Sequence, residues 1–192
     1  MQKIEEIVSE LGGIAVLSQV ENKALCQRII RAGNNGKLVR VRKGVYMLPE
    51  KLTATMIDVE AIVPGGVVCL YSAFRYHGLS TQVPAATCVA IAHSRKVQLP
   101  QFPAINLYYW NDEYLTIGVQ QIETDGVLLR ITDLERTVCD AIRYRNKIGL
   151  DVCGEVLNDY LKKPNRNIGL LNTYARQLRV HKTLTQYLEI LL

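Results

Sequence analysis

The first fifty residues change from helical to strand-like spacing of their hydrophobic positions. Apolar residues recur at helical spacing from Ile4 to Leu11, so we predict a helix there that ends at Gly12-Gly13. A second short helix is predicted over residues 15–20, and a third over residues 23–32. Apolar and basic residues then alternate around Lys43-Gly44, which indicates a β-hairpin over residues 38–48. Three helices followed by a hairpin is the order of a winged helix-turn-helix.

The remaining chain predicts a small sheet followed by helices. Strands are expected over residues 87–92, 104–110, 119–123 and 127–131, the last two joined at Asp125-Gly126. The mostly apolar segment Val67–Tyr76 fits either a helix or a strand. Thr132 and Glu135 form a capping box that opens a helix ending near Gly149, and further helices are expected over residues 151–162, 167–178 and 182–191.

These patterns predict an α+β chain of two domains. Residues 1–50 form the winged helix-turn-helix, and residues 51–192 form an α+β domain. Within the second domain, a mainly antiparallel sheet occupies about residues 64–131 and a helical region about residues 132–192.

The positive charge of the chain is concentrated in one short window. Between Lys23 and Lys43 there are seven basic residues and no acidic residue, whereas the rest of the chain has 16 basic against 18 acidic residues. A cluster of this kind is typical of a surface that binds phosphate groups.

The basic segment from Lys23 to Lys43 has the residue pattern of a helix and wing that recognise duplex DNA. Lys23, Gln27 and Arg31 follow a spacing of four residues with Arg28 beside them, so we expect one helix face to enter the major groove. Glutamine pairs with adenine and arginine with guanine, whereas Lys23 and Lys37 suit phosphates. The wing would contact flanking backbone or the minor groove. The predicted DNA-binding residues are Lys23, Gln27, Arg28, Arg31, Lys37, Arg40, Arg42, Lys43 and, from the resemblance described below, Tyr46.

Other functional classes find little support in the sequence. No apolar run reaches 18 residues and the acidic N-terminus does not resemble a signal peptide, so we expect a cytoplasmic protein without membrane contact. The five cysteines form no C-x-x-C pair, and with the three histidines they complete no zinc spacing; we expect no metal and no cofactor. Catalytic motifs are absent. The acids Glu123, Asp125, Asp133 and Asp140 leave a nuclease as a minor alternative, since no acid-x-lysine pattern accompanies them.

A second polar and basic segment lies near the end of the first C-terminal helix. It consists of Arg143, Tyr144, Arg145, Asn146 and Lys147. Basic residues favour helix C-termini because of the helix dipole. The segment therefore fits either a solvated helix end or a surface that binds a partner.

Several short motifs, in order, resemble the AbiEi family of antitoxins from type IV toxin–antitoxin systems. The wing strand KGVYMLP at Lys43–Pro49 resembles that family's R-x-G-V-Y-x-L-P. Further similar motifs cover most of the chain. They are Val68–Pro84, Asp133–Asp140, Tyr144–Asp151, Asp159–Leu161 and Gln186–Glu189. The stretch Ala92-His93-Ser94 departs from the A-x-P-R-G-like segment expected there.

The resemblance implies two roles for one non-catalytic protein. The N-terminal domain would bind repeats upstream of its own operon and repress transcription, with Lys23 to Tyr46 carrying that role. The second domain would counter a nucleotidyltransferase-type toxin in abortive infection against phage. An orphan regulator of a defence operon, without a toxin partner, is the alternative.

Overall fold

A computed structural model describes residues 2–50, 59–100, 103–124 and 127–191. The chain divides into two compact units. The first comprises Met1–Gly65, Lys96–Ile105 and Glu123–Leu129, and the second comprises Gly66–Arg95, Asn106–Ile122 and Arg130–Leu192. The expected domain boundary after residue 50 adjoins residues 51–58, which lie outside the described part of the chain.

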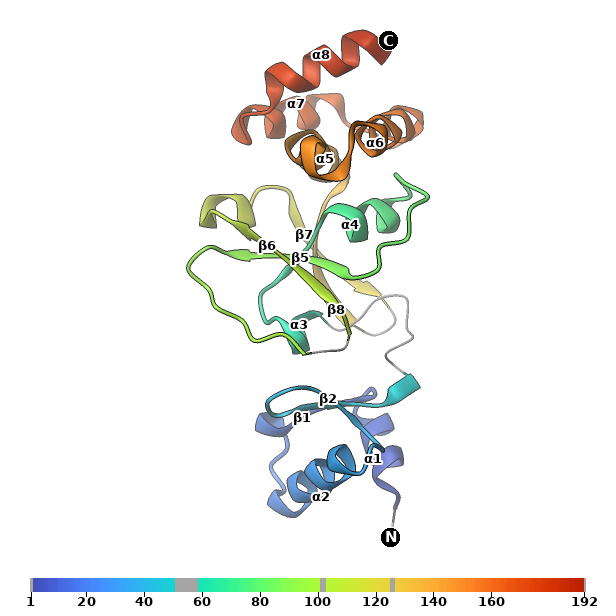
Figure 1. The fold of residues 1–192 in the computed structure, drawn as a ribbon, viewed down its shortest axis with the longest axis vertical. Coiled ribbons are helices and arrows are strands. Elements are labelled where there is room, and N and C mark those ends of the chain that lie inside the picture. The colour runs from blue at the N-terminus through green and yellow to red at the C-terminus, as the bar shows by residue number, and fades with distance from the viewer. Residues whose placement is uncertain (1, 51–58, 101–102, 125–126, 192) are drawn as a thin grey trace. The chain divides into compact units, whose positions relative to one another are not determined.

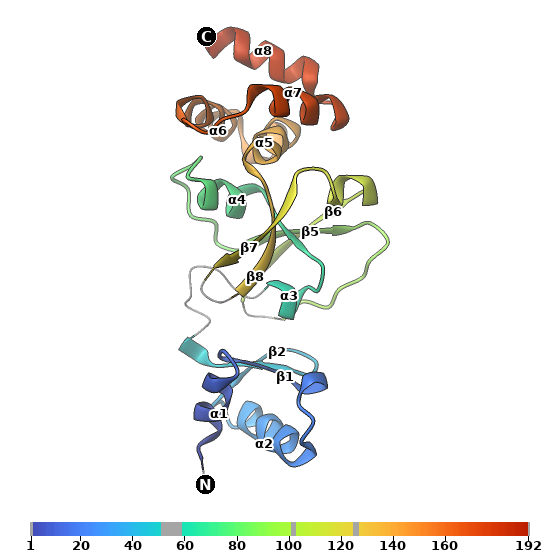
Figure 2. The same ribbon diagram turned by 180° about the vertical axis from the view of Figure 1, so that it is seen from behind.

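The N-terminal elements form two layers, in which helices pack on a small sheet. They are α1 (Ile4–Glu10), β1 (Ile14–Val16), the 3-10 helix η1 (Leu17–Gln19), α2 (Lys23–Asn34), β2 (Val39–Arg42) and β3 (Val45–Met47). The strands form an antiparallel sheet in the order β1-β3-β2. Both α1 and α2 lie against one face of this sheet (Figures 1 and 2). Ile4, Val8 and Ile29 are buried between the helices and the sheet, which fixes the apolar side of α2.

The predicted second helix over residues 15–20 is wrong. Residues 14–16 form strand β1 instead, with Ile14 opposite Met47 and Val16 opposite Val45, and only one 3-10 turn follows. The segment lies between Gly13, at φ +88°, and Asn22, which caps α2. A helix this short has marginal stability. Pairing with β3 instead satisfies the backbone hydrogen-bonding groups of residues 14–16 and suits the β-branched side chains of Ile14 and Val16. Long-range pairing therefore overrides the local pattern.

Helix α2 is two residues longer at its C-terminal end than the predicted helix over residues 23–32. The Asn22 side chain accepts hydrogen bonds from the backbone amides of Ala24 at 2.9 Å and Leu25 at 3.2 Å, which starts the helix. The helix continues through Gly33, against which the Tyr46 ring packs so closely that a methyl group at Gly33 would overlap the ring.

The larger sheet is mixed. Its strands are β4 (Val67–Val68), β5 (Thr87–Ala92), β6 (Ile105–Trp110), β7 (Val119–Thr124) and β8 (Val127–Thr132), in the order β6-β5-β4-β8-β7. Strand β4 runs antiparallel to β5 but parallel to β8, with Val68 opposite Ile131. The prediction of a mainly antiparallel sheet did not foresee this parallel pair, because β4 pairs with a strand far along the chain. The predicted Asp125-Gly126 turn lies outside the described residues.

The ambiguous segment from Val67 contains both a strand and a helix. Strand β4 is followed at once by α4 (Leu70–His77). Elsewhere in the described chain, α3 spans Val59–Ile62 and the 3-10 helix η3 spans Asp112–Leu115.

The four C-terminal helices are confirmed. They are α5 (Leu134–Ile148), α6 (Leu150–Lys162), α7 (Ile168–Gln177) and α8 (His181–Leu191). Helix α5 contacts α4, α6, α7 and α8, and it contributes Val138 and Ile142 to one core shared with Trp110 and Phe74. None of the described helices is long and apolar enough to cross a membrane.

Candidate nucleic-acid interface

The outward face of α2 carries three of the predicted DNA-binding side chains. Lys23, Gln27 and Arg31 are exposed, and they repeat at intervals of four residues along the helix. Ile29 and Ala32 are buried on the opposite side. The core therefore holds the apolar side of α2 and leaves a polar, positively charged face in solvent.

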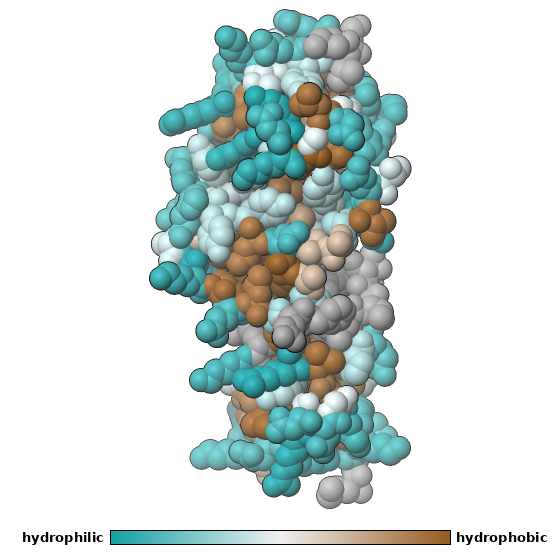
Figure 3. All heavy atoms as spheres, in the orientation of Figure 1, coloured by the Kyte–Doolittle hydropathy of each residue, from teal (hydrophilic) through white to brown (hydrophobic). Residues whose placement is uncertain are grey.

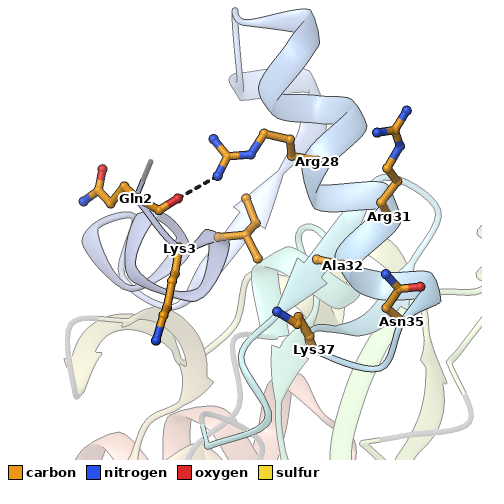
Figure 4. Close-up of a pocket in the computed structure, with 8 residues that line it drawn as sticks. Gln2, Lys3, Arg28, Arg31, Ala32, Asn35 and Lys37 are labelled. Atoms are coloured by element: carbon orange, nitrogen blue, oxygen red, sulfur yellow. Dashed lines mark hydrogen bonds between the residues drawn. The ribbon is translucent and has the colours of Figure 1, made fainter.

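Arg28 lies at the edge of that face. Its side chain is half-buried, and its guanidinium Nη2 donates a 2.7 Å hydrogen bond to the carbonyl oxygen of Gln2 (Figure 4). At 100° per residue, Arg28 points away from the direction shared by Lys23 and Gln27. The expectation that one face carries all four side chains is thus corrected, because Arg28 faces the N-terminal segment.

The predicted wing is a hairpin with a bulge. Arg40 and Lys43 are exposed, whereas Val41 is fully buried. The pairing register shifts between Arg40 and Arg42, which marks a β-bulge in the hairpin. The backbone of Arg42 pairs with Val45, and its side chain lies outside the described part of the structure.

Tyr46 belongs to the hydrophobic core of the N-terminal elements. Only 4% of its surface is exposed, and its ring packs on Gly33 of α2. A ring in this position joins the hairpin to the helix. We therefore remove Tyr46 from the residues expected to contact DNA.

Lys37 forms an ion pair with Glu5 of α1. Its Nζ lies 3.4 Å from Glu5 Oε1, and 59% of the Lys37 side chain remains exposed. A backbone hydrogen bond and the nearby Lys37 charge lower the pKa of Glu5, so this carboxylate is ionised beside the cation. An exposed pair of this kind contributes little to stability.

A basic cavity lies between the N-terminal segment and the second half of α2. Its volume is about 330 Å³. Of the described residues, four with cationic side chains and none with a carboxylate contribute to its wall. The lining residues are Gln2, Lys3, Ile4, Arg28, Arg31, Ala32, Asn35 and Lys37. Figure 4 shows Arg28 reaching across toward Gln2, with the outer parts of Arg31 and Lys3 extending from the rim.

The basic segment predicted at the end of α5 is divided between the core and the solvent. Arg143 places its guanidinium 4.3 Å from the ring centre of Tyr114, and the Tyr144 hydroxyl accepts a 2.9 Å hydrogen bond from Trp110 Nε1. Arg145 is half-exposed and donates to the Ile142 carbonyl at 3.1 Å. Asn146 and Lys147 are exposed. Arg143 and Tyr144 therefore have packing roles in addition to their partial exposure, and partner binding by this segment stays a prediction.

A buried arginine that the sequence pattern did not reveal organises the core of the second unit. Arg136 is fully buried, with Nε donating to Asp140 Oδ1 at 3.0 Å. Its Nη1 donates to the carbonyls of Tyr114 at 2.9 Å and Ile117 at 2.6 Å, and the Trp110 ring lies 4.5 Å from its guanidinium. Burial raises the pKa of Asp140 to about 6, and Arg136 opposes this shift. The arginine–acid spacing of four residues was the available signal.

The remaining polar residues of this region also have structural partners. Asp133, not the predicted Thr132, caps α5 by accepting from the Arg136 amide at 2.8 Å. Glu135 is buried and accepts from the Asn167 amide at 2.8 Å, which holds the start of α7. These bonds give Asp133 and Asp140 structural roles, and none of the described residues form a His, Cys, Asp or Glu cluster suited to a metal ion.

Comparison with known proteins leaves the family open. No family model and no curated protein matches the chain. The resemblance to the AbiEi family therefore depends on the sequence motifs alone.

Proposed function

We propose that this protein is a DNA-binding repressor of its own operon, with an N-terminal winged helix-turn-helix that reads duplex DNA. The observation that carries the proposal is the exposed face of α2, on which Lys23, Gln27 and Arg31 project from a helix whose other side is buried. Helix α2 then serves as the recognition helix, and η1 takes the place of the helix before it.

The hairpin β2–β3 serves as the wing. Arg40 and Lys43 are exposed on it and would bind phosphates beside the major groove. If about five phosphates are neutralised, the logarithm of the binding constant falls with the logarithm of salt concentration at a slope of roughly −4 to −5. Gln27 and Arg31 would read base edges, each worth about 1–3 kcal/mol of discrimination.

The second part of the proposal concerns the larger unit. We infer from the motif resemblance that it counters a nucleotidyltransferase-type toxin, and that the protein acts in the bacterial cytoplasm without catalysis of its own. Repression and toxin neutralisation then depend on different surfaces. The orphan regulator predicts repression without any neutralisation.

A mobility-shift titration tests DNA binding. The probe is the duplex immediately upstream of the gene, and the variant combines Gln27→Ala with Arg31→Ala. We expect at least a tenfold loss of affinity, since each lost base contact is worth about 1–3 kcal/mol. Arg176→Ala is the matched control, because Arg176 is exposed on α7. Equal binding by the double variant and the parent would contradict the recognition-helix assignment.

Co-expression with the product of the neighbouring gene tests the second role. The parent chain should relieve toxicity, and the Gln27→Ala/Arg31→Ala variant should relieve it equally while losing repression. A parent chain that represses but relieves no toxicity supports the orphan regulator. Cleavage of plasmid DNA by purified protein with magnesium or manganese would instead support the nuclease alternative.

A further inference from the structure

We propose that the basic cavity beside α2 holds one phosphate group of the DNA backbone. In the absence of DNA, the Glu5 carboxylate pairs with Lys37 in place of that phosphate. This inference depends on the proposed DNA-binding function and identifies a contact outside the recognition face and the wing. It assigns roles to Lys3, Arg28 and Glu5, which the recognition helix does not explain.

The chemistry of the cavity wall favours a phosphate. The side chains of Lys3, Arg28, Arg31 and Lys37 all contribute to the wall of one cavity of about 330 Å³. Phosphate oxygens accept strong charge-assisted hydrogen bonds from arginine and lysine. The volume also leaves room for water molecules, each of which takes about 30 Å³ in the liquid. Arg28 uses Nη2 to bind the Gln2 carbonyl oxygen, and a guanidinium carries four further N–H donors that suit phosphate oxygens.

The dipole of α2 does not account for this arrangement. Basic residues near a helix C-terminus often bind the last free carbonyl groups. Here backbone amides already bind two of these carbonyl groups: Asn35 N donates to Arg31 O at 3.0 Å, and Lys37 N donates to Ala32 O at 3.0 Å. Lys3 is the N-cap residue of α1, where the helix dipole disfavours a cation, so the dipole does not place its charge here either. The dipole of α2 therefore does not explain why four cationic side chains line this cavity.

Glu5 is a weak competitor for the incoming phosphate. Its ion pair with Lys37 is 3.4 Å long and partly exposed, so a phosphate can replace the carboxylate at little cost. Removing the Glu5 charge frees Lys37 and lessens repulsion of the DNA. This carboxylate therefore weakens DNA binding, although Lys37 strengthens it.

The cavity is continuous with the recognition face. Arg31 lines the cavity and lies one helical turn from Gln27. A phosphate fixed beside Arg31 would set the position of α2 along the groove. Such contacts position a protein on DNA, whereas the base contacts specify its sequence.

The test compares salt titrations of DNA binding by full-length variants. The probe is the duplex upstream of the gene, and the variants are Lys37→Gln, Glu5→Gln and the control Glu10→Gln. Glu10 lies on α1 and is not a lining residue of the cavity, and it accepts a bond from Gln2 that glutamine retains; the control therefore removes one negative charge, as Glu5→Gln does. We expect Lys37→Gln to weaken binding about tenfold and to make the slope shallower by about 0.9, the change for one lost phosphate contact.

Glu5→Gln should strengthen binding about fivefold, well beyond the effect of Glu10→Gln, because an exposed competing charge is removed. If the parent binds DNA but Lys37→Gln leaves its slope unchanged, or if Glu5→Gln only matches Glu10→Gln, the cavity proposal is overturned and the proposed function survives. A parent chain that binds no duplex overturns both.

Inorganic phosphate provides an independent measurement. In amide proton–nitrogen spectra, it should shift signals of residues 2–5 and 31–37 in the parent but not in Lys37→Gln. Such shifts combined with an unchanged DNA salt slope would mean that the cavity takes a free phosphate, which overturns the assignment to the DNA backbone.

Discussion

The hydrogen bond between Trp110 and Tyr144 allows a sharp test of the core assignment. Trp110 is 1% exposed, and its Nε1 donates to the Tyr144 hydroxyl at 2.9 Å. Tyr144→Phe removes this acceptor and keeps the ring, whose edge-to-face contact with Tyr108 has ring centres 5.6 Å apart. Little volume is lost, so the perturbation isolates the hydrogen bond.

The expected cost follows from the burial of the indole. A buried donor left without an acceptor costs about 1–3 kcal/mol. The Arg136 guanidinium lies 4.5 Å from the Trp110 ring and limits access of water to that face. Because Tyr144 itself is only half-buried, we expect the lower half of the range, about 1–2 kcal/mol. With a urea dependence of about 2 kcal/mol per molar, the middle of the usual range, the midpoint should fall by about 0.5–1 M.

Tryptophan fluorescence during urea unfolding measures this effect directly. Trp110 is the single tryptophan of the chain, so the signal reports the unit that contains it. Tyr109→Phe is the matched control, because Tyr109 is 45% exposed on the same strand. Equal midpoints for the two variants would refute the reasoning.

Two further predictions concern packing and pH. Gly33→Ala should destabilise the protein by about 1 kcal/mol in thermal unfolding, since overpacking costs about 1–3 kcal/mol and the gain in helix propensity is at most about 1 kcal/mol. A methyl group would lie 2.7 Å from Tyr46 Cδ1, so adding Tyr46→Leu should recover part of the loss; an unchanged Gly33→Ala melting temperature would contradict the contact. Burial lowers the pKa of His77 below its ordinary 6.5, and its Nε2 lies 2.7 Å from the Thr132 carbonyl oxygen. As pH falls, His77 therefore binds a proton in the unfolded chain before it does so in the folded chain, which destabilises the fold. Between about pH 8 and about pH 5, the urea midpoint should fall further in the parent than in His77→Asn. Equal falls in the two proteins would exclude His77 as the cause.

Much of the fold could be predicted from local pattern. Helix α2 has a polar cap at Asn22, an apolar stripe and a glycine-rich end, and all three signals act within a few residues. The same holds for β5, whose six residues are the predicted ones, and for the four C-terminal helices. The concentration of positive charge between Lys23 and Lys43 is likewise a property of the sequence alone.

The candidate site was only partly predictable. Spacing placed Lys23, Gln27 and Arg31 on one face of α2, since helical geometry is local. It did not reveal that Arg28 bonds to Gln2, because these residues are 26 positions apart. The cavity depends on the same long-range contact.

Tertiary structure decided the features for which local signals were ambiguous. Residues 14–16 became a strand because β3 supplied a partner, and Tyr46 became a core residue because Gly33 leaves room for its ring. Arg143 and Tyr144 lie against Tyr114 and Trp110, aromatic residues more than 25 positions away. The sequence determined which segments are helical and where charge accumulates, since both depend on neighbouring residues. Packing determined which of those charges face solvent, because burial depends on segments that meet only in the folded chain.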